Sequence, residues 1–421
     1  MEPLLAGVVA ALGVILPLLM IVGIGAIVRT VLTGRAARPL LQAGSASAHG
    51  LKPTWLGGYR GRHNGFEVKV HAATGARGPV VLVDGLPAGI SVLPEDASVR
   101  LGKAVLGGLV QDVHLGDPAV DDRFVFTGRS WIVYSSLSAE AREALLAAAR
   151  CAPDVRVQLG TLRLQLGMEA GGDEVLAAVA VASTLARALT PEGGWNAGLL
   201  RACEDPLPAV REGAARALMV DARGALRGEY ARRLLGNTDD RVRLQGALAL
   251  GPEGQGTLLE LARSDIHAVR AEAVAAVSSD APGAESAACV AMADEMLSVA
   301  LAGAALAERL GAAGPQVEGA LLTLLSRPER EAELAAIDAL AASGTARSVP
   351  ALTALADGLM FGPVRREARR AVAEVQARAS GERGALTLAG PASGGAVSLT
   401  GQGEQGAVSL TRGQVTGEKE A

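Results

Sequence analysis

One helical segment recurs through the second half of the chain, and its first copy is Pro208-Ala209-Val210-Arg211-Glu212-Gly213-Ala214-Ala215-Arg216-Ala217-Leu218. Close copies begin at Arg241, Ala268 and Pro363, and weaker copies surround Val299 and Leu334. The anchoring aliphatic positions recur about every 27 to 35 residues, a period typical of stacked helical hairpins. Each hairpin has an apolar face that it cannot bury alone, so neighbours must stack. The pattern therefore predicts an all-α solenoid, an architecture that favours a binding function.

The repeated unit resembles the bacterial short form of the HEAT-repeat family. In that family the second helix of each hairpin begins near an aspartate, passes through Val-Arg and continues in small residues. The matching positions are Asp205 with Val210-Arg211, Asp240 with Val242-Arg243 and Asp265 with Val269-Arg270. The copies near 299 and 334 lack the arginine, so they are either repeats with a different surface or a break in the array. The resemblance implies a HEAT-like solenoid over residues 191–379 that binds a protein partner.

The N-terminal run from Leu4 to Val28 holds 25 residues without a charged side chain. At about 1.5 Å per residue, such a helix exceeds the hydrocarbon core of a bilayer, which is about 30 Å thick. A signal peptide carries basic residues before its apolar stretch, whereas here none precedes the run and the first arginines follow it at positions 29, 35 and 38. Positive residues remain cytoplasmic. We therefore predict an uncleaved inner-membrane anchor with the N-terminus outside and the C-terminal bulk cytoplasmic.

Composition argues against several classes of function. The formal net charge of −4 provides no basic field for nucleic acid. Cys151, Cys203 and Cys289 lack the spacing of disulfides or zinc ligands. No two histidines stand at an i, i+4 spacing, and the phosphate-binding and nucleophile-elbow motifs are absent from the sequence. We therefore predict no catalytic residue, no metal and no cofactor, and the excess of Gly and Ala over Lys favours a bacterial source.

Residues 51–190 differ in character and predict a compact α+β domain. Apolar and polar residues alternate as in half-buried strands, and Ser138 precedes an acidic helix start as an N-cap does. Gly160-Thr161 predicts the two-residue loop of a hairpin. The expected strands are 66–71, 80–83, 90–93, 123–127, 155–159 and 162–166, and the expected helices are 138–150 and 173–189.

Two polar segments of this domain are candidate ligand sites. Asp117, Asp121 and Asp122 carry the oxygen ligands that a divalent cation prefers, or else they cap turns of a solvated loop. The segment 59–63, Tyr-Arg-Gly-Arg-His, would meet an anionic ligand or lipid head groups, or else it is a polar strand edge. A pocket in which His114 and Asp117 converge would favour an enzyme or a ligand sensor in residues 51–190.

The C-terminal tail carries a shorter repeat. Gly-Ala-aliphatic-hydroxyl-Leu begins at Gly384, Gly395 and Gly406, with a period of 11 residues. The intervening Gly, Pro, Ser and Gln residues cannot build a core and predict disorder over 380–421. The motifs are either tethered strand-like ligands that add to a sheet edge or a low-complexity product of duplication.

The sequence thus predicts a multidomain chain, which consists of a transmembrane anchor (1–28), a juxtamembrane linker (29–50), an α+β domain (51–190), a HEAT-like solenoid (191–379) and a tail (380–421). The favoured function is a non-catalytic, membrane-tethered scaffold that binds a protein partner. The repeated arginines are expected to form a ladder near the acidic caps Asp205, Asp240 and Asp265. The residues predicted to contact the partner are Arg211, Arg243, Arg270, Arg365, Leu386, Leu399 and Leu410.

Overall fold

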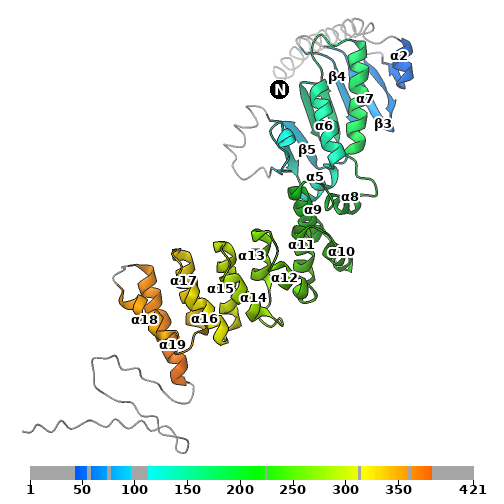
Figure 1. Ribbon diagram of the computed structural model, residues 1–421. Helices are drawn as coiled ribbons and strands as arrows, with labels where there is room; N and C mark the ends of the chain where they lie inside the picture. The colour runs from blue at the N-terminus through cyan, green and yellow to red at the C-terminus, as the bar shows by residue number, and fades with distance from the viewer. Residues whose placement is uncertain are drawn as a thin grey trace, which may run out of the picture. The chain divides into compact units, whose positions relative to one another are not determined.

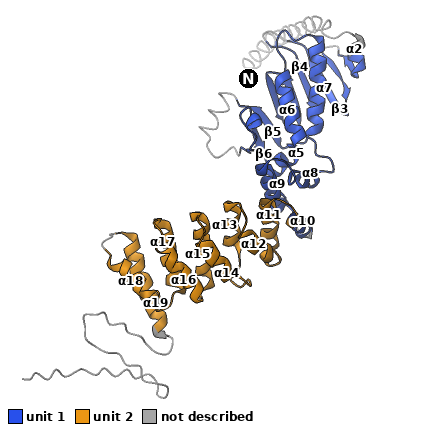
Figure 2. Ribbon diagram, viewed as in Figure 1, with its two compact units in different colours: residues 1–234 blue, residues 235–421 orange. Residues whose placement is uncertain are grey.

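The computed structural model describes residues 43–54, 58–73, 77–95, 112–222, 225–311, 314–358 and 362–381. The chain forms two compact units, Met1–Leu234 and Leu235–Ala421 (Figure 2). The predicted anchor over Leu4 to Val28 and the tail leucines Leu386, Leu399 and Leu410 lie outside the described residues. Within the described ranges, no helix combines the length and the apolar character needed to cross a membrane.

The first unit is built on an eight-stranded sheet in which every paired neighbour is antiparallel. The strand order is β1-β2-β3-β4-β8-β7-β5-β6. The expected strands are confirmed to within about one residue at each end, as boundary assignments allow. The bounds are β1 Leu51–Pro53, β2 Tyr59–His63, β3 Phe66–His71, β4 Val80–Asp84, β5 Ile90–Pro94, β6 Phe124–Gly128, β7 Asp154–Gln158 and β8 Thr161–Gln165.

The hairpin between β7 and β8 is present, but its predicted loop is wrong by one residue. The loop is Leu159-Gly160, and Thr161 pairs with Gln158 as the first residue of β8. Both loop residues have positive φ, 51° at Leu159 and 76° at Gly160. Two successive positive φ values match the right-handed twist of the flanking strands, which explains why glycine occupies the second position.

Helices α6 (Ala139–Cys151) and α7 (Gly172–Ala188) lie side by side over one face of the sheet (Figure 1). The Ser138 hydroxyl accepts from the Ala141 N–H, which confirms the predicted cap of α6. Alternate strand residues are buried on the helix-covered face, among them Val68, Val70, Val81, Val83, Leu162 and Leu164. The opposite face of β2, β3, β4, β7 and β8 carries charged and polar side chains that are partly or fully exposed.

The first unit extends beyond the predicted boundary at residue 190. Helices α8 (Trp195–Ala202) and α9 (Pro208–Asp221) pack against α5 (Ser130–Ser136), a buried helix that the sequence pattern did not reveal. Gly213 of α9 lies so close to α5 that an added Cβ would come within 2.1 Å of Tyr134 Cζ. The first Val-Arg helix therefore belongs with the sheet, because its small residues fit against α5.

The second unit is a series of stacked helices that begins after α10 (Ala225–Leu235). Alternate helices pack on one another along the array, α11 on α13, α13 on α15, α15 on α17 and α17 on α19. The intervening helices pack on the same partners and close one continuous apolar core. The bounds are α11 Asp240–Leu250, α12 Gln255–Leu261, α13 His267–Ala276, α14 Ala284–Met292, α15 Leu297–Leu310, α16 Pro315–Leu324, α17 Arg330–Ser343, α18 Val349–Asp357 and α19 Pro363–Gly381.

The two weak sequence copies are genuine repeats and not a break in the array. Val299 of α15 is fully buried in the common core, and Leu334 of α17 packs against that core while it remains partly exposed. Gly303 makes the close contact between α14 and α15 possible, since an added Cβ would lie 2.8 Å from both Ala291 Cβ and Met292 N. The array therefore continues without the Val-Arg signature where small residues supply the fit.

Candidate functional site

The four repeated arginines occupy equivalent places at the starts of α9, α11, α13 and α19. Arg211 Nη1 donates to the carbonyl oxygens of Asp205 and Pro206, at 2.8 and 2.9 Å. Arg365 Nε donates to the carbonyl of Ala356 at 2.9 Å. These arginines bind backbone that precedes their own helix, so they fix the connection between the two helices of a pair.

Arg243 and Arg270 reach further and join successive elements. Arg243 binds Asp240 Oδ1 at 3.1 Å and Glu260 Oε2, on α12, at 2.7 Å. Arg270 Nε and Nη2 bind both carboxylate oxygens of Asp294, at 2.8 and 3.2 Å. The expected partner Asp265 is wrong, because the guanidinium of Arg270 points along the array to the turn after α14. Asp240 serves as the predicted acidic partner of Arg243, and Asp205 accepts from Arg211 through its backbone carbonyl.

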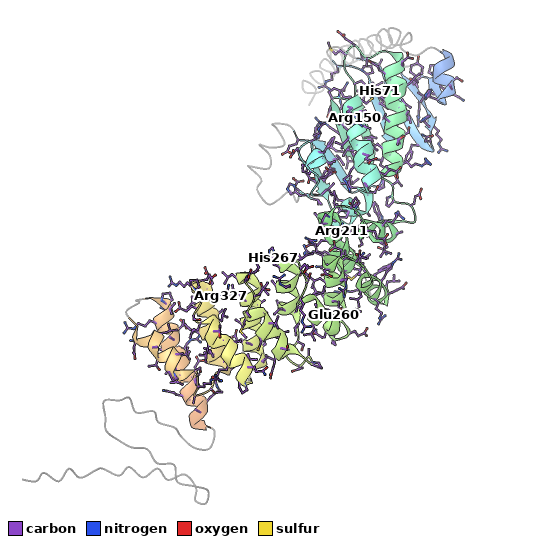
Figure 3. The ribbon with its side chains drawn as sticks, viewed as in Figure 1. His71, Arg150, Arg211, Glu260, His267 and Arg327 are labelled. Carbon is purple, nitrogen blue, oxygen red and sulfur yellow. The ribbon has the colours of Figure 1, made fainter. Side chains whose placement is uncertain are left out.

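Asp294 is a junction between three successive helix pairs. Its carboxylate binds Arg270 of α13, and its carbonyl accepts from Arg327, which precedes α17, at 2.8 Å. Burial acts to raise the pKa of Asp294, but the hydrogen bonds from Arg270 and from the Met296 N–H outweigh it, and the pKa lies below its ordinary value. The carboxylate therefore stays ionised and holds the repeats in register. Figure 3 labels Arg327 and the helix-start residue His267 on these repeats.

Sequence reasoning missed two further arginines at the other ends of the helices. Arg309 of α15 donates to the carbonyls of Ala275 and Val277, at the C-terminal end of α13. Arg378 of α19 does the same for Ala341 and Gly344, at the end of α17. Cations at helix C-termini satisfy carbonyls that lack an intrahelical partner. The arginine in the last turn of α15 and of α19 is the feature of the sequence that could have predicted these contacts.

The helices that carry the arginines form the more tightly packed layer, defined here as the inner layer (α11, α13, α15, α17 and α19). Within it, α13, α15, α17 and α19 pack closely on one another and α11 packs more lightly on α13, whereas α12 and α14 leave a groove of about 230 Å³ between them.

The exposed face of the inner layer carries small apolar residues on α13, α15 and α17, interspersed with exposed charged residues such as Glu272 and Glu308. These apolar residues are partly or fully exposed, and Ala271, Ala302, Leu334 and Ala335 also pack against the core. Toward α19, Arg370 binds Asp338 of α17 at 2.7 Å. We call the central part the alanine strip, which consists of Ala268, Ala271, Ala275, Leu301, Ala302, Ala305, Leu334 and Ala335.

The acidic candidates of the first unit cap turns. Asp117 Oδ1 accepts from the Ala119 N–H and caps α4 (Pro118–Asp121). Asp121 accepts from the N–H groups of Leu115, Gly116 and Asp117. No group of three potential metal ligands occurs within the described parts of the chain. The hydrogen bonds of Asp117 and Asp121 are those of the turn-capping interpretation.

The pocket that would have favoured an enzyme is not formed by the residues expected to make it. The His114 side chain is 73% exposed, and its Nε2 lies 3.7 Å from Asp112 Oδ2. Asp117 lies instead 3.6 Å from the buried Arg142. The segment 59–63 is strand β2, which pairs with both β1 and β3, so it is a strand but not the edge of the sheet that the alternative expected.

All three cysteines are free thiols. Burial raises the pKa of the Cys203 thiol to about 12, and burial also raises the pKa values of Cys151 and Cys289. Neutral thiols are poor nucleophiles and poor metal ligands at physiological pH. These cysteines therefore behave as small apolar side chains.

No known family profile matches the chain, and no curated protein sequence matches it. Solved structures that are similar include YibA of Escherichia coli, with 15% identity over 49% of this chain and 78% of that one and a TM-score of 0.36. Computationally designed armadillo repeat proteins for modular peptide recognition give 17% identity, 42% and 98% coverage and a TM-score of 0.32. Cex1p gives 11% identity, 76% and 94% coverage and a TM-score of 0.29.

Structural similarity at TM-scores this low does not indicate what the chain binds. The class of the protein follows from its own geometry. The second unit is a helical repeat solenoid, in which arginines join consecutive helix pairs and a shared apolar core runs through the stack.

Proposed function

We propose that this protein is a membrane-tethered scaffold that binds a protein partner through the inner layer of its helical repeats. The single observation that supports this most is the alanine strip. Its short side chains leave backbone and apolar surface open to close approach, while the arginines of the ladder are occupied by helix ends and carboxylates. Arg211, Arg243, Arg270 and Arg365 then contribute to binding indirectly, because they hold the helices that present the strip.

The chemistry of the strip favours an amphipathic helix or an extended apolar peptide as the bound element. Large apolar side chains of a partner fit between small ones, and groove binding of this kind is a recurring mode of peptide recognition. Glu367 and Arg370 at the α19 end already form a hydrogen-bonded pair at 2.8 Å. Charged partners therefore gain less from that end than from the apolar centre.

A site-specific photo-crosslinker tests this proposal in cells that express the full chain. We expect a crosslinker at Ala305, on the strip, to give one dominant protein adduct. The matched control is a crosslinker at Ser286, an exposed residue of α14 in the other helix layer. Equal adducts at both positions, or no adduct at Ala305, would contradict binding through the inner layer.

The membrane tether is the second part of the proposal and rests on the uncharged run from Leu4 to Val28. Reporter fusions at residue 50 and at the C-terminus are expected to be cytoplasmic. Export of either reporter, or release of a shortened mature chain, would contradict it.

The three tail motifs ending at Leu388, Leu399 and Leu410 form the third part, since weak tethered ligands gain avidity from repetition. Deletion of residues 384–421 is expected to weaken recovery of the Ala305 adduct without changing the stability of the second unit. Unchanged recovery would contradict a binding role for Leu386, Leu399 and Leu410.

A further inference from the structure

A row of positive side chains crosses the exposed face of the sheet in the first unit. The register places Lys52 opposite Arg60, Arg60 opposite Lys69, Lys69 opposite Leu82, Leu82 opposite Arg163, and Arg163 opposite Arg156. Directly paired residues share a face of the sheet, and neighbouring strands lie about 4.8 Å apart. Five of six consecutive positions across the sheet are therefore cations, although the whole chain has a net charge of −4.

Carboxylates neutralise part of this row. Arg60 lies 2.5 Å from Glu67, Lys69 lies 2.6 Å from Asp84, and Arg156 lies 2.7 Å from Asp154. In the Lys69 pair the hydrogen bond raises the pKa of Lys69 and lowers that of Asp84. The row is thus compensated at three of its positions.

Lys52, in the edge strand β1, and Arg163, in the interior strand β8, are the two cations of the row for which the described residues provide no carboxylate. Arg163 Nη2 donates instead to the neutral amide oxygen of Gln165 at 2.9 Å. Like charges directly opposite each other destabilise a sheet, yet Arg163 faces Arg156 across the β7–β8 pair. The sheet therefore tolerates an unfavourable arrangement that an anion would relieve.

A hollow of about 450 Å³ opens at this point of the sheet. Arg77, Arg156 and Arg163 line it, together with Asp154 and Gln165. The loop that carries Arg77 is held in place, because Gln165 Nε2 donates to the Gly78 carbonyl at 2.8 Å. Gly78 is required there, since an added Cβ would lie 2.2 Å from the Gly167 carbonyl oxygen. The hollow is therefore shaped by fixed backbone as well as by surface side chains.

We propose that this hollow binds the phosphate group of a phosphorylated small molecule or lipid. Three arginines and one aspartate leave a net charge of +2, which matches a phosphate monoester carrying about −1.5 to −2 at neutral pH. Guanidinium groups bind such oxyanions through paired N–H donors. The hollow is far larger than one phosphate, so the rest of it receives the organic part of the ligand.

The first test measures binding of inorganic phosphate and of glycerol 3-phosphate to the full chain in non-ionic detergent, with chloride at equal ionic strength as the reference. We expect both phosphates to slow hydrogen exchange in the segment 154–168. No protection beyond that given by chloride would overturn the proposal, as would tighter binding of a mixed-sequence oligonucleotide than of glycerol 3-phosphate.

Variants assign the effect to the hollow. Arg163→Gln is expected to weaken glycerol 3-phosphate binding about tenfold, the size typical of one lost charge-assisted hydrogen bond. Asp154→Asn is expected to strengthen binding, because it frees Arg156 and removes a negative charge. The matched control is Arg150→Gln, an exposed residue of α6. An equal loss in all three variants would overturn the assignment.

Nanodiscs distinguish the two sources of the phosphate. Protection of 154–168 in phosphatidylcholine discs that contain phosphatidic acid, but not in phosphatidylcholine discs alone, assigns the hollow to a lipid head group. Protection by glycerol 3-phosphate without any effect of phosphatidic acid assigns it to a free phosphorylated metabolite. Protection by neither ligand would overturn the site.

Discussion

Arg142 and Asp205 form a bidentate ion pair inside the first unit, with Nη1–Oδ2 and Nη2–Oδ1 distances of 3.1 and 2.9 Å. Their side chains are only 5% and 4% exposed. Arg142 Nη1 also donates to the Leu137 carbonyl at 2.9 Å, and Asp205 accepts from the Leu207 N–H. The pair joins α6 to the turn before α9 across 63 residues of sequence.

Removing one partner of this pair should destabilise the first unit strongly. We expect Asp205→Ala to lower its free energy of unfolding by about 3–5 kcal/mol, because the buried Arg142 then loses both of its hydrogen bonds to a carboxylate and keeps only Asp117, 3.6 Å away. The double variant Arg142→Met/Asp205→Leu should recover much of that loss. Urea unfolding followed by tryptophan fluorescence measures it, since all three tryptophans lie within residues 1–234.

The control for Asp205→Ala is Glu212→Ala, which removes a pair with Arg216 whose side chains are 35% and 56% exposed. Exposed pairs contribute less than about 1 kcal/mol. If Asp205→Ala lowers the free energy of unfolding no more than Glu212→Ala does, the buried pair does not stabilise the first unit as predicted.

The ladder arginines should differ in their contribution to the second unit. Arg270→Gln removes a bidentate contact with Asp294 and a bond to the Ser264 carbonyl, and should cost about 1–3 kcal/mol. Arg243→Gln should cost less than about 1 kcal/mol, because its partner Glu260 is 68% exposed. Loss of helical circular dichroism in urea measures both. An equal loss of stability in the two variants would contradict the prediction that the more buried ion pair contributes more.

Acid should weaken the second unit through Asp294. Its pKa in the folded chain lies below the unfolded value, so the unfolded state binds the proton more readily. The contribution is complete above the ordinary carboxyl pKa and is lost as pH falls through the lower folded one. Arg270→Gln should therefore reduce the loss of stability below about pH 4, near the ordinary carboxyl pKa. An unchanged acid profile would show that Asp294 is not responsible.

Core truncation should affect the solenoid according to burial. Leu340 is fully buried in α17, and Leu340→Ala should cost about 2–5 kcal/mol through lost packing and a cavity. Val290 on α14 is 50% exposed, and Val290→Ala should cost less than about 0.5 kcal/mol. Helical circular dichroism in urea compares them while tryptophan fluorescence monitors the first unit. Similar costs at both positions would contradict the assigned core.

Cys203 should resist alkylation in the folded protein. Its pKa of about 12 leaves very little thiolate at pH 8, and the residue is buried. Partly exposed Cys151 and Cys289 should react with iodoacetamide first, as peptide mass spectrometry would show. Because the folded pKa is raised, the associated stability is present below about pH 9 and declines as pH rises toward 12. Labelling of Cys203 at the rate of Cys151 would disprove its burial.

The sequence by itself determined the kinds of elements and much of their order. Alternation identified β3, an apolar run followed by turn residues identified β4, and Ser138 marked the start of α6, because these signals are local to the residues that carry them. The Val-Arg repeats identified stacked helix pairs for the same reason. Each copy shows a one-sided apolar pattern that only a neighbour can bury.

Only the tertiary structure decided which elements belong together. The sheet order inserts β8 and β7 between β4 and β5, and α9 packs on α5 although its sequence reads as the first repeat. Arg270 binds Asp294 although Asp265 is nearer in the sequence, and Arg163 lies opposite Arg156 in the sheet. Such contacts depend on register and packing between distant segments. Local periodicity carries no information about them, because any strand or helix of suitable pattern would satisfy it equally well.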